Sequence, residues 1–148
     1  NKKDEQWYIN TNQSFAFADD TVTASYGSAT PKAHADTLYT AQDEIDGKGT
    51  EGEVAAEGLK TIKIRDVKSE ASELLNKTDW YNHKALDDET FTIPANITTY
   101  RANVRTKSNE METAINNASD VDALAALYAY NDDDPPTRPL GEFPILEI

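Results

Sequence analysis

The chain contains no cysteine, a single methionine and few basic residues, with 14 Lys and Arg against 27 Asp and Glu over 148 positions. Without cysteine the protein has no disulfide bridge, thiolate nucleophile or Cys-ligated zinc, so its stability must come from packing. No apolar run approaches the roughly 20 residues of a membrane-spanning helix. The first residues do not resemble a signal peptide, and we therefore expect a soluble protein without a targeting segment.

The formal charge of −13 is distributed unevenly along the chain. Residues 1–58 carry four basic and 11 acidic side chains, residues 59–119 carry nine of each, and residues 120–148 carry one basic and seven acidic. Both ends are therefore acidic, and such a surface repels nucleic-acid phosphates and anionic lipids. We expect a protein as the partner, and neither nucleic acid nor a membrane.

Residues 1–58 are predicted to form a small β-rich region. Apolar residues alternate there with small or polar ones in short clusters that Asn and Asp separate: residues 7–9, 15–17 and 22–26. Such a pattern is typical of antiparallel strands joined by tight turns, and it predicts a β-hairpin or a three-stranded meander. Further short strands are expected at 37–40 and 54–56. The glycine-rich segment 46–52 between them is expected to be an exposed loop.

Residues 59–130 are predicted to form a helical region. Apolar residues at spacings of three and four predict an amphipathic helix from about 60 to 77, and a second stripe predicts a helix from Pro94 to about 117. The members of the second stripe are Ile97, Tyr100, Val104, Met111 and Ile115. Ser119 and Asp122 resemble a capping box, which predicts a shorter third helix as far as Tyr128.

The run Asp132-Asp133-Asp134-Pro135-Pro136 ends any helix, so residues 131–148 are predicted to be an extended, acidic and Pro-rich tail. The fold class is therefore α+β: a small antiparallel β N-terminal half, followed by a helical hairpin plus a short third helix and the extended C-terminal tail. Whether the two halves form one domain stays open, because a chain of this length can hold one ordinary domain or two small ones.

The segment 42–53 has some features of a calcium-binding loop. Glu44, Asp46 and Glu53 stand at ligand positions of an EF-hand, but Gln42 stands where the first ligand should be Asp. The interpretation as a solvated acidic loop is favoured, and a calcium-stabilised module is kept as a weaker alternative.

Two acidic runs and two histidines are the other candidates for chemistry. Residues 87–89 and 132–134 have no nucleophile or base beside them, and charge runs are usually solvated. His34 and His83 lie in predicted loops without ligand-like spacing. We therefore expect no catalytic residue, no metal, no cofactor and no enzyme activity.

Aromatic and apolar residues near the ends of the predicted elements are the candidate partner contacts. Trp80 is expected first as a core residue at a helix end and second as a partner contact, and Trp7 and Tyr8 allow the same two interpretations. The C-terminal tail is the stronger candidate, because its apolar residues must dock either on their own domain or on a partner. The full set is Trp7, Tyr8, Trp80, Phe143, Ile145 and Leu146.

Two short motifs in the helical region carry a resemblance. Thr78-Asp79-Trp80 is followed, about twenty residues later, by Tyr100-Arg101-Ala102-Asn103-Val104-Arg105. The first is expected to stop a helix, and the Tyr and Arg residues of the second could pack back onto Trp80. Together with the ending Arg138-Pro139-Leu140-Gly141-Glu142-Phe143-Pro144, they resemble the C-terminal half of the small tail-fibre and tail-assembly chaperones of tailed bacteriophages. The resemblance covers about residues 60–145.

The resemblance implies a non-enzymatic protein that binds the distal end of a phage tail fibre, assists its trimerisation and folding, and in some phages remains on the virion. Its location would be the host cytoplasm during assembly. Binding would use strand edges of the N-terminal half or the apolar tail. The alternative is a permanent structural virion subunit of the fibre, baseplate or neck, with no chaperone role.

Overall fold

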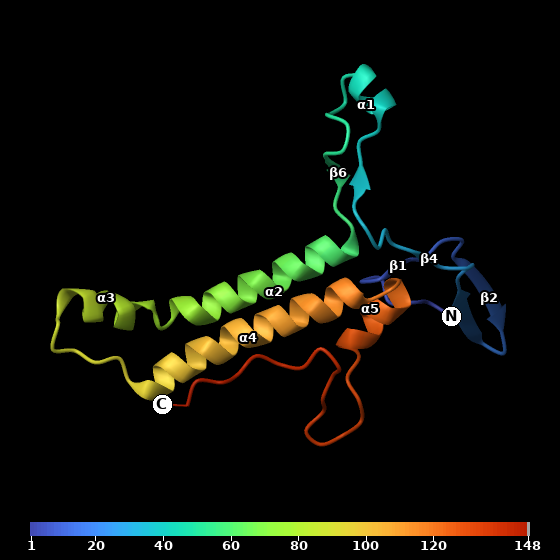
Figure 1. The fold of residues 1–148 in the computed structure, drawn as a ribbon. Coiled ribbons are helices and arrows are strands. Elements are labelled where there is room, and N and C mark those ends of the chain that lie inside the picture. The colour runs from blue at the N-terminus through green and yellow to red at the C-terminus, as the bar shows by residue number, and fades with distance from the viewer. Residues whose placement is uncertain (148) are drawn as a thin grey trace. The chain divides into compact units, whose positions relative to one another are not determined.

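The computed structural model of the chain describes residues 1–147 and has the predicted α+β fold, with short antiparallel strands in the N-terminal half and mainly helices after them (Figure 1). The chain divides into two compact units. We call Asn1–Thr61 together with Ser119–Ala125 the N-terminal unit. The helical unit consists of Ile62–Ala118 and the described residues from Ala126 onward.

The strands of the N-terminal unit pair two by two, which gives three separate antiparallel sheets over the described residues. The pairs are β1 (Tyr8–Ile9) with β4 (Thr30–Pro31), β2 (Ser14–Ala18) with β3 (Thr21–Ser25), and β5 (Thr37–Leu38) with β6 (Val54–Ala56). The predicted hairpin is confirmed by β2 and β3. A three-stranded meander does not form, because β1 takes β4 as its partner.

A short helix, α1 (Ala41–Ile45), lies where the sequence predicted no helix. Thr40 caps it: the Thr40 hydroxyl accepts the Asp43 N–H at 3.3 Å, and the Asp43 carboxylate accepts the Thr40 N–H at 3.1 Å. This is a capping box in which Asp replaces the usual Glu or Gln. The helix has no buried residue, so no apolar stripe accompanied the cap in the sequence.

Trp7 and Tyr8 are both buried in the N-terminal unit. The Tyr8 hydroxyl donates a hydrogen bond to the Asp122 carboxylate. The Lys3 ammonium lies 4.0 Å from the centroid of the Tyr8 ring and 4.0 Å from the same carboxylate. These contacts explain why residues 119–125, at the start of helix α5 (Val121–Tyr128), belong to the same unit as residues 1–61.

Glycine is required at position 58, because a Cβ atom there would lie 2.3 Å from the carbonyl carbon of Ala35. The close approach lets the Gly58 N–H donate to Asp36 Oδ1 at 2.7 Å, while the Thr61 hydroxyl donates to Asp36 Oδ2 at 2.9 Å. These hydrogen bonds lower the pKa of Asp36, and the bond from the Gly58 N–H has the largest effect. The start of the long helix that follows is thereby tied to the residue directly before β5.

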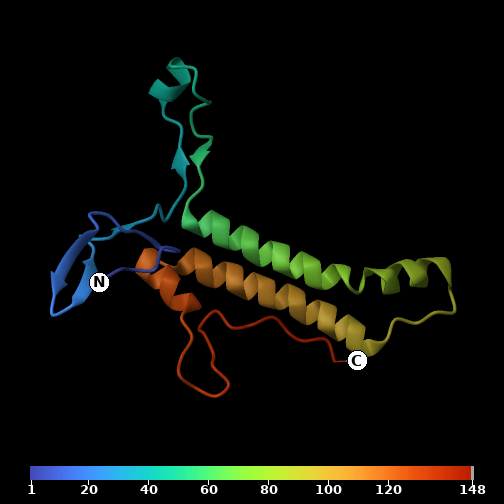
Figure 2. The ribbon, with the colours of Figure 1, turned by 180° about the vertical axis from the view of Figure 1, so that it is seen from behind.

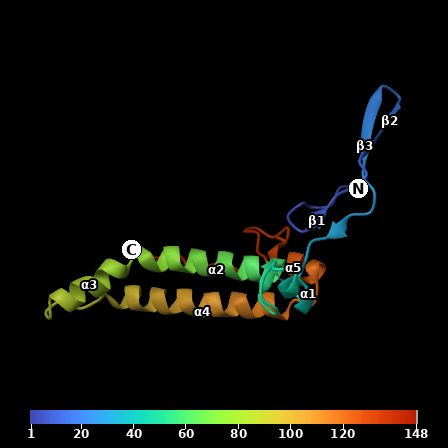
Figure 3. The same cartoon turned by 90° about the horizontal axis from the view of Figure 1, so that it is seen from above.

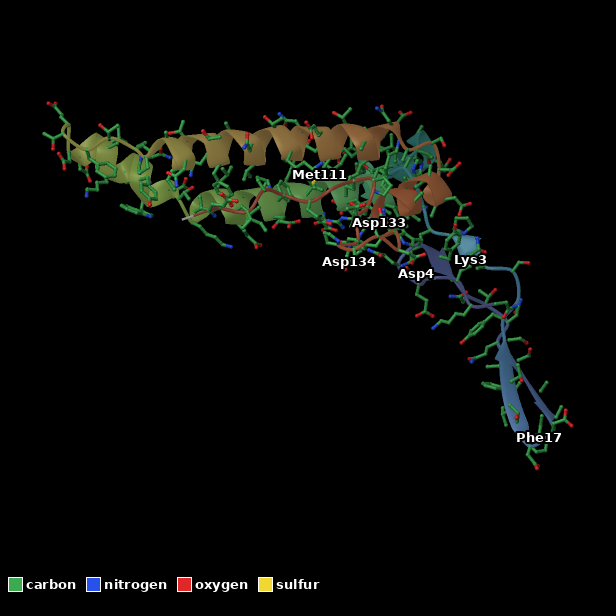
Figure 4. All side chains as sticks on the ribbon, turned by 90° about the horizontal axis from the view of Figure 1, so that it is seen from below. Lys3, Asp4, Phe17, Met111, Asp133 and Asp134 are labelled. Carbon is green, nitrogen blue, oxygen red and sulfur yellow. The ribbon has the colours of Figure 1, made fainter. Side chains whose placement is uncertain are left out.

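The helical unit is built on two long antiparallel helices, α2 (Leu59–Asn76) and α4 (Ala95–Asn117), which lie side by side in every ribbon view (Figure 1, Figure 2 and Figure 3). Both predicted spans are confirmed to within one residue at each end. All five members of the predicted stripe on α4 are buried, and Met111 lies on the side of α4 that faces α2 (Figure 4). Arg101 and Ser108 are buried with them.

A further short helix, α3 (Asp79–Asp87), follows α2 after a break at Thr78. The sequence predicted that Thr78-Asp79-Trp80 stops a helix, and α2 does end there. The sequence did not predict the helix that begins at Asp79. The negative charge of Asp79 suits the positive end of the dipole of this helix. Thr78 is buried and its hydroxyl donates to the Leu75 carbonyl at 2.9 Å.

The predicted third helix is confirmed as α5 (Val121–Tyr128), but its cap differs from the expectation. Asp120 Oδ1 accepts the Ala123 N–H at 2.8 Å, so Asp120 and not Ser119 caps the helix. This hydrogen bond from the Ala123 N–H is also the largest cause of the lowered pKa of Asp120. Asp and Ser are both good caps, and adjacent candidates are hard to separate by sequence alone.

From Ala129 to Glu147 the chain contains no helix or strand and returns along the helical unit (Figure 2). Asn131 closes a loop by donating its N–H to the Thr137 carbonyl at 2.8 Å, and Asp133 and Asp134 lie in this loop (Figure 4). The Leu140 N–H then bonds to the Leu127 carbonyl at 2.9 Å. The predicted extended tail is therefore held along its own unit.

Candidate interaction surface

The β2–β3 hairpin carries three exposed large apolar side chains of the N-terminal unit. All ten of its strand residues are exposed. Phe15, Phe17 and Val22 retain 68, 72 and 63% of their accessible surface (Figure 4 labels Phe17). Large apolar side chains are normally among the most buried in a protein, so three of them uncovered on one hairpin indicate a contact surface.

The hairpin has one apolar and one polar face. Phe15 is paired with Ala24 and Phe17 with Val22, so these four side chains lie on the same face, which we call the apolar face. The opposite face carries Ala16, Ala18 and four hydroxyl residues: Ser14, Thr21, Thr23 and Ser25. Alternation of this kind is typical of strands that cover a core on one side only. In this hairpin neither face is covered, so the apolar face that would normally meet a core is exposed as well.

Two aspartates form the turn of the hairpin. Asp19 and Asp20 both have positive φ, 52° and 57°. Positive φ at both central residues defines the type I′ turn, whose twist matches the twist of the paired strands. Asp tolerates this region better than most residues, because its short side chain bonds locally. The turn therefore fixes the register that places the aromatic rings on one face.

The strand edges of the hairpin carry no charged side chain and no proline. Between Gln6 and Pro31 the only charged residues are Asp19 and Asp20, although charged residues make up 28% of the chain. Proteins usually protect exposed edges with Lys, Pro or a bulge. The hairpin has none of these, and it is paired with no third strand among the described residues.

Trp7 and Tyr8, two of the predicted contact residues, are core residues of the N-terminal unit, with exposed fractions of 5 and 6%. They leave almost no surface for a partner. Phe15 and Phe17 were absent from the predicted contact set, although their alternation was recognised. Alternation alone does not mark them as contact residues, because it does not say whether the apolar face of a strand pair is covered.

Trp80 was expected first as a core residue, and that expectation is wrong, because 52% of its surface is exposed. Its ring stacks on Tyr81 at a centroid distance of 3.8 Å, with Phe91 at 6.5 Å. The Lys84 ammonium lies 4.4 Å from the centroid of the Phe91 ring. The second expectation, that Trp80 contacts a partner, remains a prediction.

The three predicted contact residues of the tail divide into two groups. Phe143 and Leu146 are half-buried and pack against the core cluster of the helical unit, which contains Tyr100 and Val104. Ile145 points outward, with 88% of its surface exposed. The tail therefore docks on its own unit through two residues and leaves one for solvent or a partner.

The acidic loop considered for calcium has an internal cation. The Lys48 ammonium lies 3.0 Å from carboxylate oxygens of both Asp43 and Asp46. Lys48 therefore offsets one of their two negative charges. In residues 1–147 no group of three or more His, Asp or Glu side chains is placed to hold a metal ion.

A groove of about 430 Å³ runs between α2 and α4. Its cations are Arg101, Arg105 and Lys68, and two of them already have carboxylate partners. Arg101 lies 2.7 Å from Asp79, and Lys68 lies 3.1 Å from Glu112. The groove is thus part of the packing of the helical hairpin.

Comparisons of the chain with protein-family models, with curated proteins and with solved structures find no match. Within the described part of the chain, no helix combines the length and apolar character that crossing a membrane requires. The structural feature that bears most directly on function is the exposed apolar surface of the β2–β3 hairpin.

Proposed function

We propose that this chain is a non-enzymatic bacteriophage tail or tail-fibre assembly protein that binds a fibre or other tail protein. The proposal takes the class of protein from the resemblance of the motifs at 78–80 and 100–105. The observation that carries it is the uncovered apolar face of the β2–β3 hairpin, formed by Phe15, Phe17, Val22 and Ala24.

An apolar face on a two-stranded hairpin suits an assembly role. Fibre and tail proteins are expected to expose apolar surface before their subunits have joined, and such surface aggregates unless something covers it. The hairpin offers apolar side chains with free strand edges, a combination that can cover a face and an edge together. The net charge of −13 would steer the protein toward a basic partner.

The test is co-expression of a phage fibre or tail protein with the wild-type chain, with a variant, or alone. We expect the wild-type chain to raise the yield of soluble, correctly assembled partner. The double variant Phe15→Ser/Phe17→Ser should lose this effect. Ile45→Ser is the matched control, because Ile45 is an exposed apolar residue of the same unit outside the hairpin. Partner that assembles equally well without the chain would exclude a chaperone role.

Mass spectrometry of purified particles separates the proposal from its alternative, the permanent structural subunit. A fixed, high copy number in the virion would favour the structural subunit. Absence from the particle, together with the co-expression effect, would favour a released assembly protein.

A further inference from the structure

We propose that the β2–β3 hairpin binds by strand addition: one edge of the hairpin pairs with an unpaired edge strand of a β-sheet in the partner, while its apolar face covers apolar side chains beside that edge. The inference rests on the proposed function for the identity of the partner. It adds the kind of surface that the partner must present and the backbone groups that make the contact.

The turn geometry fixes which backbone groups are available. A two-residue turn closes on a hydrogen-bonded pair, here Ala18 and Thr21. Hydrogen-bonded and non-hydrogen-bonded pairs alternate along an antiparallel ladder. The backbone N–H and C=O groups that point outward therefore belong to two residues of β2, Phe15 and Phe17, and to two of β3, Val22 and Ala24.

The outward-pointing backbone groups and the apolar face belong to the same four residues. A partner strand that bonds to Phe15 and Phe17, or to Val22 and Ala24, is thereby aligned beside the apolar face. In strand addition the main-chain bonds supply affinity and alternate side chains supply specificity. The hairpin has both elements at one site.

An isolated two-stranded hairpin is only marginally stable in water, and a third strand or a packed face usually stabilises it. In the described chain β2 and β3 pair only with each other, and every residue of both strands is exposed. One internal aid is the pair of hydroxyls at the open end, where Ser14 Oγ and Ser25 Oγ lie 2.9 Å apart. Further strands from a partner would complete the sheet.

A second copy of this chain fits the surface poorly. Taking ~200 Å² for an aromatic side chain, the two Phe rings and Val22 offer roughly 350 Å² of apolar area per copy. Two copies face to face would bury about 700 Å² of apolar side-chain area, so polar and backbone atoms would have to supply the rest of the ~1,200 Å² of total area at which stable specific interfaces begin. Each copy also carries a charge of −13, which opposes self-association. A different protein with a neutral or basic surface avoids this repulsion and is therefore the occupant that fits.

The first experiment is amide hydrogen exchange on the wild-type chain, alone and in complex with the tail or fibre protein used for co-expression. Strand addition predicts that the outward amides of one strand, Phe15 and Phe17 or Val22 and Ala24, become protected in the complex. The outward amides of the other strand should stay fast. Unchanged exchange across the hairpin in a stable complex would overturn the inference and leave the proposed function standing.

Proline substitution provides the second experiment, since proline is tolerated at an edge position whose N–H points outward. Phe15→Pro blocks the β2 edge and Ala24→Pro blocks the β3 edge, with Phe15→Leu and Ala24→Val as matched controls that keep the N–H. We expect one proline variant to weaken the complex by roughly tenfold or more, and both controls to bind within about threefold. Cross-strand nuclear Overhauser effects between Ala16 and Thr23 would verify that each variant keeps its hairpin.

The remaining outcomes each decide one claim. If both proline variants bind normally but Phe17→Ser does not, the contact uses the apolar face alone and strand addition is excluded. Concentration-dependent dimers of the free wild-type chain in sedimentation, lost in Phe17→Ser, would make a second copy the occupant. A hairpin-dependent complex with a β-sheet protein that is unrelated to tails would keep the inference and remove the proposed function. If the chain binds neither a tail or fibre protein nor any other β-sheet protein, both the inference and the proposed function are excluded.

Discussion

The Arg101 guanidinium on α4 lies 2.7 Å from the Asp79 carboxylate at the start of α3. The same side chain donates to the Leu75 carbonyl at 2.8 Å and to the Thr78 hydroxyl at 2.6 Å. One buried arginine thus binds the last turn of α2, the break that follows and the first residue of α3. The two sequence motifs, at 78–80 and 100–105, therefore meet through Arg101, which contacts Thr78 and Asp79.

Replacing Arg101 should therefore weaken the helical unit. Arg101→Ala leaves the Leu75 carbonyl and the Thr78 hydroxyl without their charged donor, and we expect a loss of about 2–4 kcal/mol in the free energy of unfolding. Urea denaturation followed by circular dichroism would measure it. Arg105→Ala is the matched control from the same motif, because Arg105 is exposed and its contact is one 3.4 Å bond to a backbone carbonyl. Its effect should stay within about 0.5 kcal/mol, and equal losses in the two variants would contradict this assignment.

The apolar tail provides a second test, because neighbouring residues differ in burial. Phe143 packs against the core of the helical unit, whereas Ile145 is exposed. Phe143→Ala should lower the free energy of unfolding by about 1–3 kcal/mol and make the tail sensitive to limited proteolysis. Ile145→Ala should change neither property. A tail that is cleaved as fast in the wild-type protein as in Phe143→Ala would show that the docking is too weak to matter.

Much of the helical unit could be predicted from the sequence. The stripe on α4 repeats at three and four residues, and a helix of 23 residues gives that period room to stand out. The short elements could not be predicted as well. Helix α1 has five residues and buries none of them, so only its cap could have marked it.

The candidate surface was predictable in part, for a physical reason. Alternation at Phe15 and Phe17 predicts a strand, and that strand exists. Alternation cannot tell whether the apolar face is covered, because coverage depends on which elements lie against it. Trp80 shows the same limit in the opposite direction, since a tryptophan at the end of a long helix was expected to be buried and is half exposed.

The capping box of α1 should open in acid. Hydrogen bonds from the Thr40 hydroxyl, then from the Thr40 N–H and then from Lys48, lower the pKa of Asp43 from 3.8 to about 2. Since the folded pKa is the lower one, the contribution of the Asp43 carboxylate to stability is present above pH 3.8. It is lost as the pH falls through about 2. Carboxyl NMR of Asp43 would follow this directly.

Thr40→Ala is the informative variant for this titration. It removes the hydrogen bond from the Thr40 hydroxyl, which is the largest cause of the lowered pKa, so the pKa of Asp43 should rise toward 3.8. Lys48→Met should raise the pKa of Asp43 by less, because Lys48 is a weaker cause than Thr40. If the pKa of Asp43 rises more in Lys48→Met than in Thr40→Ala, the ion pair with Lys48, and not the cap, is the main cause of the lowered pKa.

The two tryptophans offer one spectroscopic reporter for each unit. Trp7 is buried in the N-terminal unit, whereas Trp80 is half exposed on α3 of the helical unit. In Trp80→Phe the remaining emission should be blue-shifted and resistant to acrylamide, since water and quencher cannot reach Trp7. In Trp7→Phe the emission of Trp80 should be red-shifted and readily quenched. If the two variants have the same emission maximum and the same quenching constant, the opposite burial of the two rings is refuted.

The Trp7→Phe variant, in which Trp80 is the remaining tryptophan, can also test the prediction that Trp80 contacts a partner. A partner that covers α3 should shift its emission to the blue, whereas binding through the hairpin alone should leave it unchanged.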